Sequence, residues 1–182
     1  MAKNVIITGA SGMVGGLILK RCLNSSEVAQ VTSLVRKPTG VKHQKLREIT
    51  IEDFTNYQGF ADLMCDQQVA FFCIGVYTGA VSRDLFRTIT IDYPVAFGRA
   101  LHRCSPKARV LLLSGQGADQ SGKSRIAFAH DKGMAEKALL EQGFAAVHCF
   151  RPGYIYPVEP RQEPNFSYRL MRWLYPSVLR HM

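Results

Sequence analysis

The chain has 182 residues, of which 47% are hydrophobic and 20% charged, and its formal net charge is +9. This length suits one folded domain with a sizeable core, and the composition is ordinary for a globular protein. No stretch approaches the roughly 18 consecutive apolar residues of a membrane helix, and no targeting segment opens the chain, so we expect no membrane span and a cytoplasmic location. The basic residues are spread out and lack the interleaved aromatic residues of an RNA-binding motif, so we expect no nucleic-acid partner.

Short apolar runs alternate with segments of helical periodicity along the chain. Strands are expected at residues 5–8, 30–35, 46–51, 68–74, 108–113 and 145–150. Helices are expected at residues 13–22, from Ser82 or Arg83 to His102 in two pieces around Pro94, at 127–141 and at 166–174. This alternation predicts an α/β fold, a doubly wound parallel sheet with both faces covered, in three α/β/α layers. We expect one Rossmann domain over residues 1–182.

A glycine-rich turn joins the first expected strand to the first expected helix. Gly9 permits the tight turn, Gly12 allows the backbone to approach a pyrophosphate, and Gly15 allows the helix to pack closely on the strand. The free N–H groups at the start of the helix favour bound phosphate. The turn therefore predicts a dinucleotide site made by Thr8, Gly9, Ser11, Gly12, Met13, Val14 and Gly15.

The second expected strand ends at Val35 and is followed by Arg36 and Lys37. An acidic residue at this point would accept hydrogen bonds from the ribose hydroxyls of NAD, whereas a guanidinium grips a 2′-phosphate. The basic pair therefore indicates NADP(H) as the cofactor. The alternative is that both residues are surface charges after a strand.

Two further strand ends supply expected cofactor contacts. Asp53 and Phe54 follow the third strand, where a carboxylate and an aromatic ring would meet the edge and face of an adenine. The fourth strand brings Cys73, Ile74 and Gly75 to the same carboxyl edge of the sheet, beside the cofactor.

The five cysteines, at positions 22, 65, 73, 104 and 149, show neither zinc-ligand nor redox CxxC spacing. We expect them to be small buried hydrophobic residues in a reducing compartment, and we expect no metal site.

Several motifs, taken together and in order, give the chain a family resemblance. They are residues 8–15, Leu34-Val35-Arg36, Cys73-Ile74-Gly75, Leu113-Ser114, Lys132-Gly133-Met134-Ala135-Glu136 and Arg151-Pro152-Gly153. With them the chain resembles the short-chain dehydrogenase/reductase superfamily, in its atypical branch of small NAD(P)H-binding proteins, over nearly its whole length. The resemblance implies that Pro152, Gly153 and Ile155 contact the nicotinamide carboxamide through their backbone.

In that superfamily a serine after the fifth strand, and a tyrosine and a lysine four apart on the next helix, carry out the chemistry. Ser114 and Lys132 match this pattern, but the position four before Lys132 is Phe128, which cannot transfer a proton. The resemblance therefore implies nucleotide binding more firmly than catalysis. A proton would have to come from Tyr154, from Tyr156 or from water, since His130 is expected at the surface.

Two functions remain open from the sequence. The first is an NADP(H)-dependent oxidoreductase that reduces a small carbonyl-type substrate, with Ser114, Lys132 and Tyr154 as catalytic residues. The second is a non-catalytic NADP(H)-binding sensor or regulatory module, and a sugar-nucleotide epimerase is the least favoured class. Apolar residues after Arg169 suggest a homodimer contact as a hypothesis.

Overall fold

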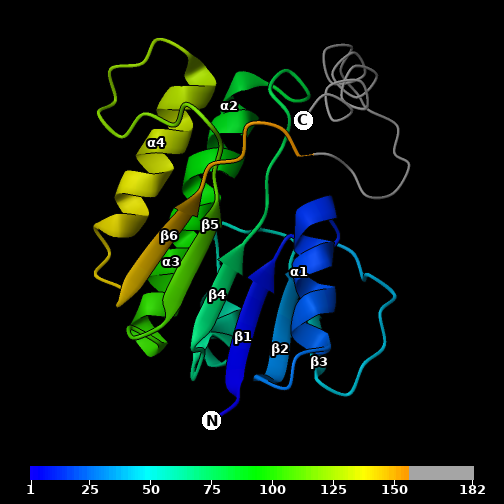
Figure 1. Ribbon diagram of the computed structural model, residues 1–182. Helices are drawn as coiled ribbons and strands as arrows, with labels where there is room; N and C mark the ends of the chain where they lie inside the picture. Colours follow the sequence, from blue (N-terminus) through cyan, green and yellow to red (C-terminus); the bar gives the residue numbers. More distant parts are fainter. Residues whose placement is uncertain (156–182) are drawn as a thin grey trace, which may run out of the picture. The chain divides into compact units, whose positions relative to one another are not determined.

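In the computed structural model of the protein, residues 1–155 are described. Their six strands form one parallel sheet in the order β3-β2-β1-β4-β5-β6. The strands are β1 (Lys3–Thr8), β2 (Val28–Val35), β3 (Leu46–Thr50), β4 (Val69–Phe72), β5 (Arg109–Leu113) and β6 (Ala146–Phe150). The helical segments are α1 (Met13–Leu23), η1 (Gln58–Met64), α2 (Arg83–Arg87), η2 (Thr88–Asp92), α3 (Tyr93–Cys104) and α4 (Ala127–Leu140). The expected Rossmann fold is confirmed, and η1 is an addition that the sequence did not predict (Figure 1).

The strand order reverses at β1, which has β2 on one side and β4 on the other. The register pairs Thr8, the last residue of β1, with Leu34 of β2 and with Phe72 of β4. The carboxyl ends of three strands therefore lie side by side at the point where open α/β sheets bind ligands.

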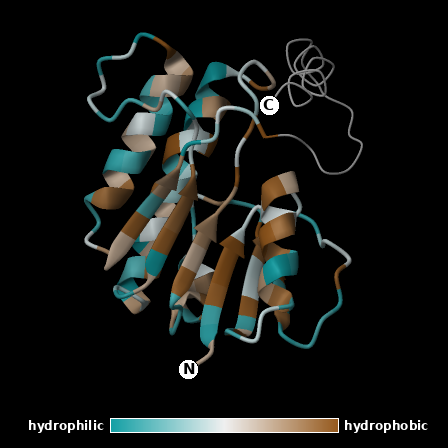
Figure 2. Ribbon diagram, viewed as in Figure 1, coloured by the Kyte–Doolittle hydropathy of each residue, from teal (hydrophilic) through white to brown (hydrophobic). Residues whose placement is uncertain are grey.

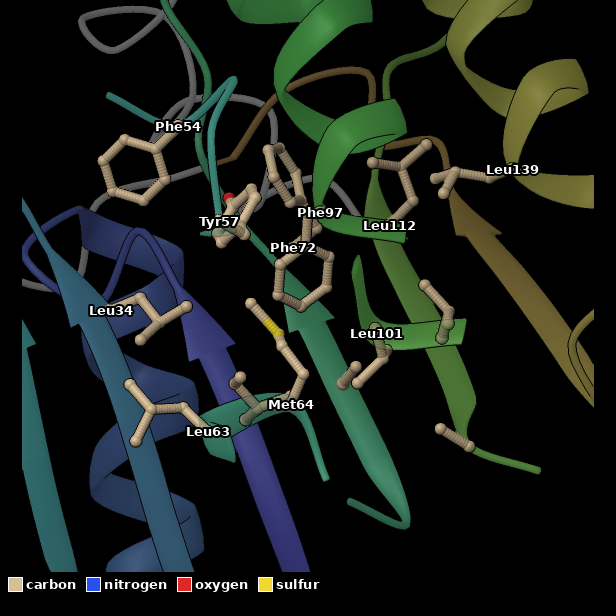
Figure 3. Close-up of a cluster of buried hydrophobic side chains, with 14 of the residues drawn as sticks. Leu34, Phe54, Tyr57, Leu63, Met64, Phe72, Phe97, Leu101, Leu112 and Leu139 are labelled. Carbon is tan, nitrogen blue, oxygen red and sulfur yellow. The ribbon is translucent and has the colours of Figure 1, made fainter. Parts of the chain in front are cut away.

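Alternation along β1 directs its side chains into two different cores. Val5 and Ile7 pack with α1 residues, whereas Ile6 packs on the opposite side of the sheet. Figure 3 shows the second core, in which Phe72 of β4 and Phe97 of α3 have ring centroids 5.6 Å apart. β1 begins with polar residues and continues with hydrophobic ones, because its later side chains are buried on both sides of the sheet (Figure 2).

The helix expected from Ser82 or Arg83 to His102 is helical over its length but changes its hydrogen-bonding pattern. A π-helical turn, η2, separates α2 from α3, and Pro94 lies in the first turn of α3. Proline has no N–H to donate and its ring crowds the preceding turn, so a wider turn before it relieves the clash. The expected break is confirmed, and it lies just before Pro94.

The expectation that both faces of the sheet are covered is correct only in part for residues 1–155. On the face shared with α1, the outward residues of β5 and β6 include Arg109 and His148, both exposed. Phe150, on the same face, is 55% exposed. Figure 1 shows α1 over one half of the sheet and no described helix over this face of β5 and β6.

Residues Met1–Pro152 form one compact unit, and a second unit begins at Gly153. One domain over the whole chain stays a prediction. The helix predicted at 166–174, Tyr156 and the hypothetical dimer contact lie outside the described residues. Within the described part of the chain, no helix combines the length and the apolar character needed to cross a membrane.

The expectation that every cysteine is buried is correct for Cys22 and wrong for Cys104. Cys104 is exposed at the end of α3, and Cys65, Cys73 and Cys149 are partly exposed.

Candidate nucleotide site at the switch point

The glycine turn has the geometry that its sequence predicted. Gly9 has a φ of +77°, and a Cβ built on it would lie 2.6 Å from the carbonyl carbon of Cys73. A Cβ on Gly15 would lie 2.1 Å from the carbonyl oxygen of Gly9, so α1 approaches the turn more closely than any side chain allows. Gly12 donates its N–H to that same oxygen at 2.9 Å and is the N-cap of α1. Glycine is therefore required at positions 9 and 15 by close backbone approach.

The first turn of α1 contains no acidic residue, and no side chain from residues 1–155 caps the helix. The backbone N–H groups of the first turn and the positive end of the helix dipole favour an anion at this point. Thr8, which precedes the turn, is fully buried, and its hydroxyl has no hydrogen-bond partner among the described residues.

A hollow of about 420 Å³ lies next to this turn. Its lining comes from the glycine turn, the ends of β2 and β4, the segment after β3, and α2, η2 and α3. The lining residues are Gly9, Ser11, Gly12, Leu34, Val35, Arg36, Phe54, Cys73, Ile74, Gly75, Val76, Val81, Leu85, Ile89 and Tyr93. The walls are mainly apolar, as expected for a site that takes up a planar ring.

Arg36 is the one charged residue among the described residues that line this hollow. It directly follows β2, it is exposed, and within residues 1–155 no acidic side chain forms an ion pair with it. Lys37 is also exposed. Glu48 of β3, which pairs with Ser33 in the register, accepts hydrogen bonds from the backbone and the hydroxyl of Thr39 at 2.8 and 2.6 Å.

Asp53 and Phe54 differ in how they relate to the hollow. Phe54 is 2% exposed and lines the hollow, and its contact with an adenine stays a prediction. The Asp53 carboxylate instead accepts hydrogen bonds from the N–H and hydroxyl of Thr55, and these bonds lower the pKa of Asp53. The side-chain oxygens that we expected at an adenine edge are thus held within their own loop.

A second polar cluster lies beyond β4, where β5 ends and α4 packs against it. Ser114 follows β5, and its hydroxyl donates to the carboxylate of Glu136 at 2.5 Å. Arg151 makes a two-point contact with the same carboxylate, with its Nε at 2.9 Å, and Gln120 donates to it at 2.7 Å. Burial alone would raise the pKa of Glu136, but these hydrogen bonds outweigh it and lower the pKa. Glu136 is fully buried and was not among the residues expected in the site.

Lys132 lies one turn before Glu136 on α4. Its Nζ donates to the carbonyl oxygen of Leu113, the last residue of β5, at 3.3 Å. Burial lowers the pKa of Lys132 to about 8, and the charge of Glu136 limits the fall. The amine therefore lies at the carboxyl edge of the sheet, as its place in the sequence predicted.

A buried ion pair also links α2 to α4. Asp131 is fully buried, and Arg83 contacts it through both terminal nitrogens, one of them at 2.9 Å. Burial alone would raise the pKa of Asp131, but hydrogen bonds from Arg83 and from the half-exposed His130 lower it. The pair holds α2, whose Leu85 lines the hollow, against α4. No local pattern reveals it, because Arg83 and Asp131 are far apart in the sequence.

No family model matches the chain. Among curated proteins it is 29% identical to Protein HTATIP2 of Rattus norvegicus over 178 residues, which cover 97% of this chain and 72% of that protein. It is 27% identical to the mitochondrial protein fmp52 of Aspergillus niger over 176 residues, covering 93% of this chain and 73% of that one.

Solved structures with the same fold include MoeE5 in complex with UDP-glucose and NAD, with a TM-score of 0.70 and 19% identity. The match covers 93% of this chain and 60% of that chain. A short-chain dehydrogenase from Burkholderia cenocepacia in complex with NADP has a TM-score of 0.69 at 16% identity, covering 88% of this chain and 78% of that one. The sequence relatives and the fold agree with the motifs. The chain is thus similar to proteins of the short-chain dehydrogenase/reductase superfamily and shares their Rossmann fold.

The superfamily's tyrosine position, four residues before Lys132, is occupied by Phe128. A Cβ built on Gly115 would lie 2.4 Å from Cζ of Phe128, so the ring fills the space beside Gly115. Ser114, one residue earlier, directs its hydroxyl to Glu136. Within the described residues, therefore, the position that faces Phe128 has no hydroxyl, and the catalytic role of Ser114 stays a prediction that this geometry does not support.

The remaining expected residues lie at the end of the described segment. Pro152 belongs to the first unit, and its carbonyl accepts a hydrogen bond from the N–H of Gln116 at 3.0 Å. Gly153, Tyr154 and Ile155 belong to the second unit, so their roles in the site stay predictions. The names of the two fmp52 relatives from Aspergillus species include the word mitochondrial, and the cytoplasmic location of this chain also stays a prediction.

Proposed function

We propose that this chain is an NADP(H)-binding protein that holds the adenosine and pyrophosphate of the cofactor at the switch point. The pyrophosphate would lie on Gly12 and the first turn of α1, where the helix has no capping side chain. Phe54 and the apolar ends of β2 and β4 would contact the adenine and its ribose. Ser11, Met13 and Val14 would contribute through the backbone of the turn.

Arg36 is the observation that carries the choice of NADP(H). The residues that line the hollow contain this one charge, and no carboxylate within residues 1–155 pairs with it. A 2′-phosphate would accept two hydrogen bonds from the guanidinium, with Lys37 as a second cation nearby. The solved neighbours, whose titles name NAD or NADP, are compatible with either cofactor, so the choice depends on Arg36.

The nicotinamide half would extend from Cys73, Ile74 and Gly75 toward Lys132. The Lys132 amine would donate to the ribose hydroxyls, the role that the superfamily gives to this lysine. Pro152 would contact the carboxamide. NADPH bound in this way would supply a hydride.

Binding without turnover is the function that this arrangement favours. Proton transfer in the superfamily needs a tyrosine where Phe128 lies, and Ser114 is held by Glu136. Such a protein would sense or sequester NADP(H). A reductase acting on a small carbonyl-type substrate is the second candidate, and the observation that favours it is the pKa of about 8 for Lys132. In that case water would deliver the proton.

The first experiment is a titration with NADPH and with NADH, followed by nicotinamide fluorescence, on the wild type and on Arg36→Ala. We expect NADPH to bind more tightly than NADH. A charge-assisted hydrogen bond contributes about 1.5–3 kcal/mol, so Arg36→Ala should weaken NADPH binding by about 10- to 100-fold and leave NADH binding nearly unchanged. Lys42→Ala, which removes an exposed charge from the same loop, should change neither affinity by more than twofold.

Equal affinity for the two cofactors would contradict the role of Arg36. Absence of binding to either would contradict the proposed function itself. A loss of NADH affinity in Arg36→Ala as large as the loss of NADPH affinity would show that Arg36 acts on the loop and not on the 2′-phosphate.

A further inference from the structure

Two cysteines that are distant in sequence meet at the surface of the first unit. Cys65 follows η1, and Cys104 is the last residue of α3. Their thiols donate to the same acceptor, the carbonyl oxygen of Ala61, with the sulfur atoms at 3.5 and 3.8 Å from it. The two thiols lie close enough for the Cys104 thiol to raise the pKa of Cys65. They therefore form a dithiol pair, in contrast to the isolated buried cysteines that the sequence suggested.

The backbone on either side of this pair is fixed by buried hydrogen bonds. The hydroxyl of Ser105, next to Cys104, donates to the carbonyl oxygen of Met64 at 2.8 Å. It also accepts from the N–H of Gln67 at 3.0 Å. Ser105 and Gln67 are both buried. Because the ends of η1 and α3 are joined in this way, the thiols are held in proximity before any reaction, which favours an intramolecular step over an intermolecular one.

Cys104 is exposed, whereas Cys65, Cys73 and Cys149 are partly exposed and Cys22 is buried. Burial raises the pKa of Cys73 to about 12 and that of Cys149 to about 11. A small oxidant in solution therefore reaches Cys104 first.

We propose that Cys65 and Cys104 form a redox-active dithiol, which a low-molecular-weight disulfide such as oxidised glutathione converts to an intramolecular disulfide. The Cys104 thiolate attacks one sulfur of the oxidant, forms a mixed disulfide and releases one glutathione thiolate. The Cys65 thiolate then attacks Sγ of Cys104, which forms the Cys65–Cys104 bond, breaks the bond to glutathione and releases the second thiolate. The two protons from the protein thiols end on the two glutathione molecules, and two electrons pass to the oxidant.

The order of attack follows from exposure. Cys104 is exposed, whereas Cys65 is only partly exposed, so the oxidant reaches Cys104 first. The Cys104 thiol, burial and the carboxylates of Asp62 and Asp66 raise the pKa of Cys65 to about 11. Cys65 is therefore the second nucleophile.

The dithiol lies at the edge of the sheet opposite the glycine turn. Cys65 precedes β4, which begins at Val69, whereas Gly9 follows the end of β1. The chain between the cysteines includes β4 and α3, so a disulfide would clip η1 to the end of α3 without entering the hollow. The inference is independent of the proposed function.

The test treats the reduced full-length protein with oxidised glutathione and maps the peptides by mass spectrometry without reduction. We expect loss of two free thiols, a linked peptide that contains Cys65 and Cys104, and reversal by dithiothreitol. Cys65→Ser should stop at a stable glutathione adduct on Cys104. Cys149→Ala, which leaves the pair intact, should form the same linked peptide as the wild type.

A wild-type protein that accumulates glutathione on Cys104 without forming the link would overturn the proposal. A link between any other two cysteines would do the same, as would equal adduct stability in the wild type and in Cys65→Ser. Circular dichroism of each variant verifies folding. A thermal midpoint that fails to rise on oxidation, despite complete linkage, would show that the bond strains the scaffold and contradict the pre-organised geometry.

Discussion

The ring of Phe128 occupies the space into which a side chain at Gly115 would point, with Cζ 2.4 Å from an ideal Cβ at that position. Gly115 follows Ser114 at the end of β5, and Phe128 lies in the first turn of α4. A serine at 115 and the present ring at 128 would therefore exclude one another unless the ring moved. The two positions are coupled, and together they leave an apolar contact where proton transfer would require hydroxyls.

Phe128→Tyr should introduce reductase activity if the rest of the site holds NADPH as proposed. The new hydroxyl would lie beside Gly115 and within one helical turn of Lys132, whose pKa of about 8 favours proton transfer near neutral pH. A positioned general acid contributes about 10²–10⁴-fold, so we expect oxidation of NADPH by an activated diketone to rise by about that factor. The measurement is the absorbance of NADPH under single-turnover conditions.

Phe128→Leu serves as the control for that experiment, because it removes the ring without adding an acid. Equal activity of the wild type and Phe128→Tyr, both well above Phe128→Leu, would contradict a non-catalytic wild type.

Glu136→Gln should destabilise the fold and flatten its pH dependence in acid. The pKa of Glu136 is lower in the folded protein than in the unfolded chain, where it is about 4.3. The ionised carboxylate therefore stabilises the fold above about pH 4.3, and this stabilisation is lost as the pH falls through the folded-state pKa. Removing one partner of a buried ion pair costs about 3–5 kcal/mol, and partial exposure of Arg151 reduces this to about 2–3 kcal/mol. Urea unfolding at pH 7 and at pH 4 measures both effects.

Glu141→Gln is the matched control, because Glu141 forms an exposed ion pair with Lys137 at 3.9 Å on the same helix. An exposed pair of this kind contributes about 0.3–0.5 kcal/mol. Similar losses for the two variants would show that the contacts to Ser114, Gln120 and Arg151 do not stabilise the fold.

Lys132 should titrate near pH 8, well below an ordinary lysine. Desolvation disfavours its charged form, and the negative charge of Glu136 partly offsets that effect. Glu136→Gln should therefore lower the pKa of Lys132 further. Nitrogen-detected NMR of the lysine amines across pH 6–11 follows this titration, and a Lys132 signal that titrates near 10.4 would contradict its burial.

Gly15→Ala should abolish nucleotide binding and reduce stability, because its Cβ would lie 2.1 Å from the carbonyl oxygen of Gly9. Backbone cannot yield to a contact of that length, so α1 would move away from β1 and the first-turn N–H groups would lose their alignment. Gly59→Ala has nothing within 4 Å and should retain both properties. NADPH titration and thermal unfolding of the two variants form the test. Retained binding in Gly15→Ala would show that the close approach is not needed.

The sequence by itself determined the strands, the order of elements and the glycine turn. Buried parallel strands are read as short apolar runs, and the spacing of Gly9, Gly12 and Gly15 depends on contacts within a few residues of one another. The break near Pro94, which the structure shows as a π-helical turn, is predictable too, because proline disturbs the helical turn directly before it. Arg36 was placed correctly at the end of β2, because its position depends only on where the strand ends.

Only the tertiary structure decided which polar groups meet. Ser114 was expected to face a substrate, but its hydroxyl donates to the carboxylate of Glu136 on α4. The approach of Gly115 to Phe128 and the meeting of Cys65 with Cys104 join segments that are distant along the chain. Such contacts depend on how helices pack on the sheet, and local sequence patterns do not predict that packing. Burial then fixes the partners, since a buried polar group without a partner costs more free energy than most single contacts supply.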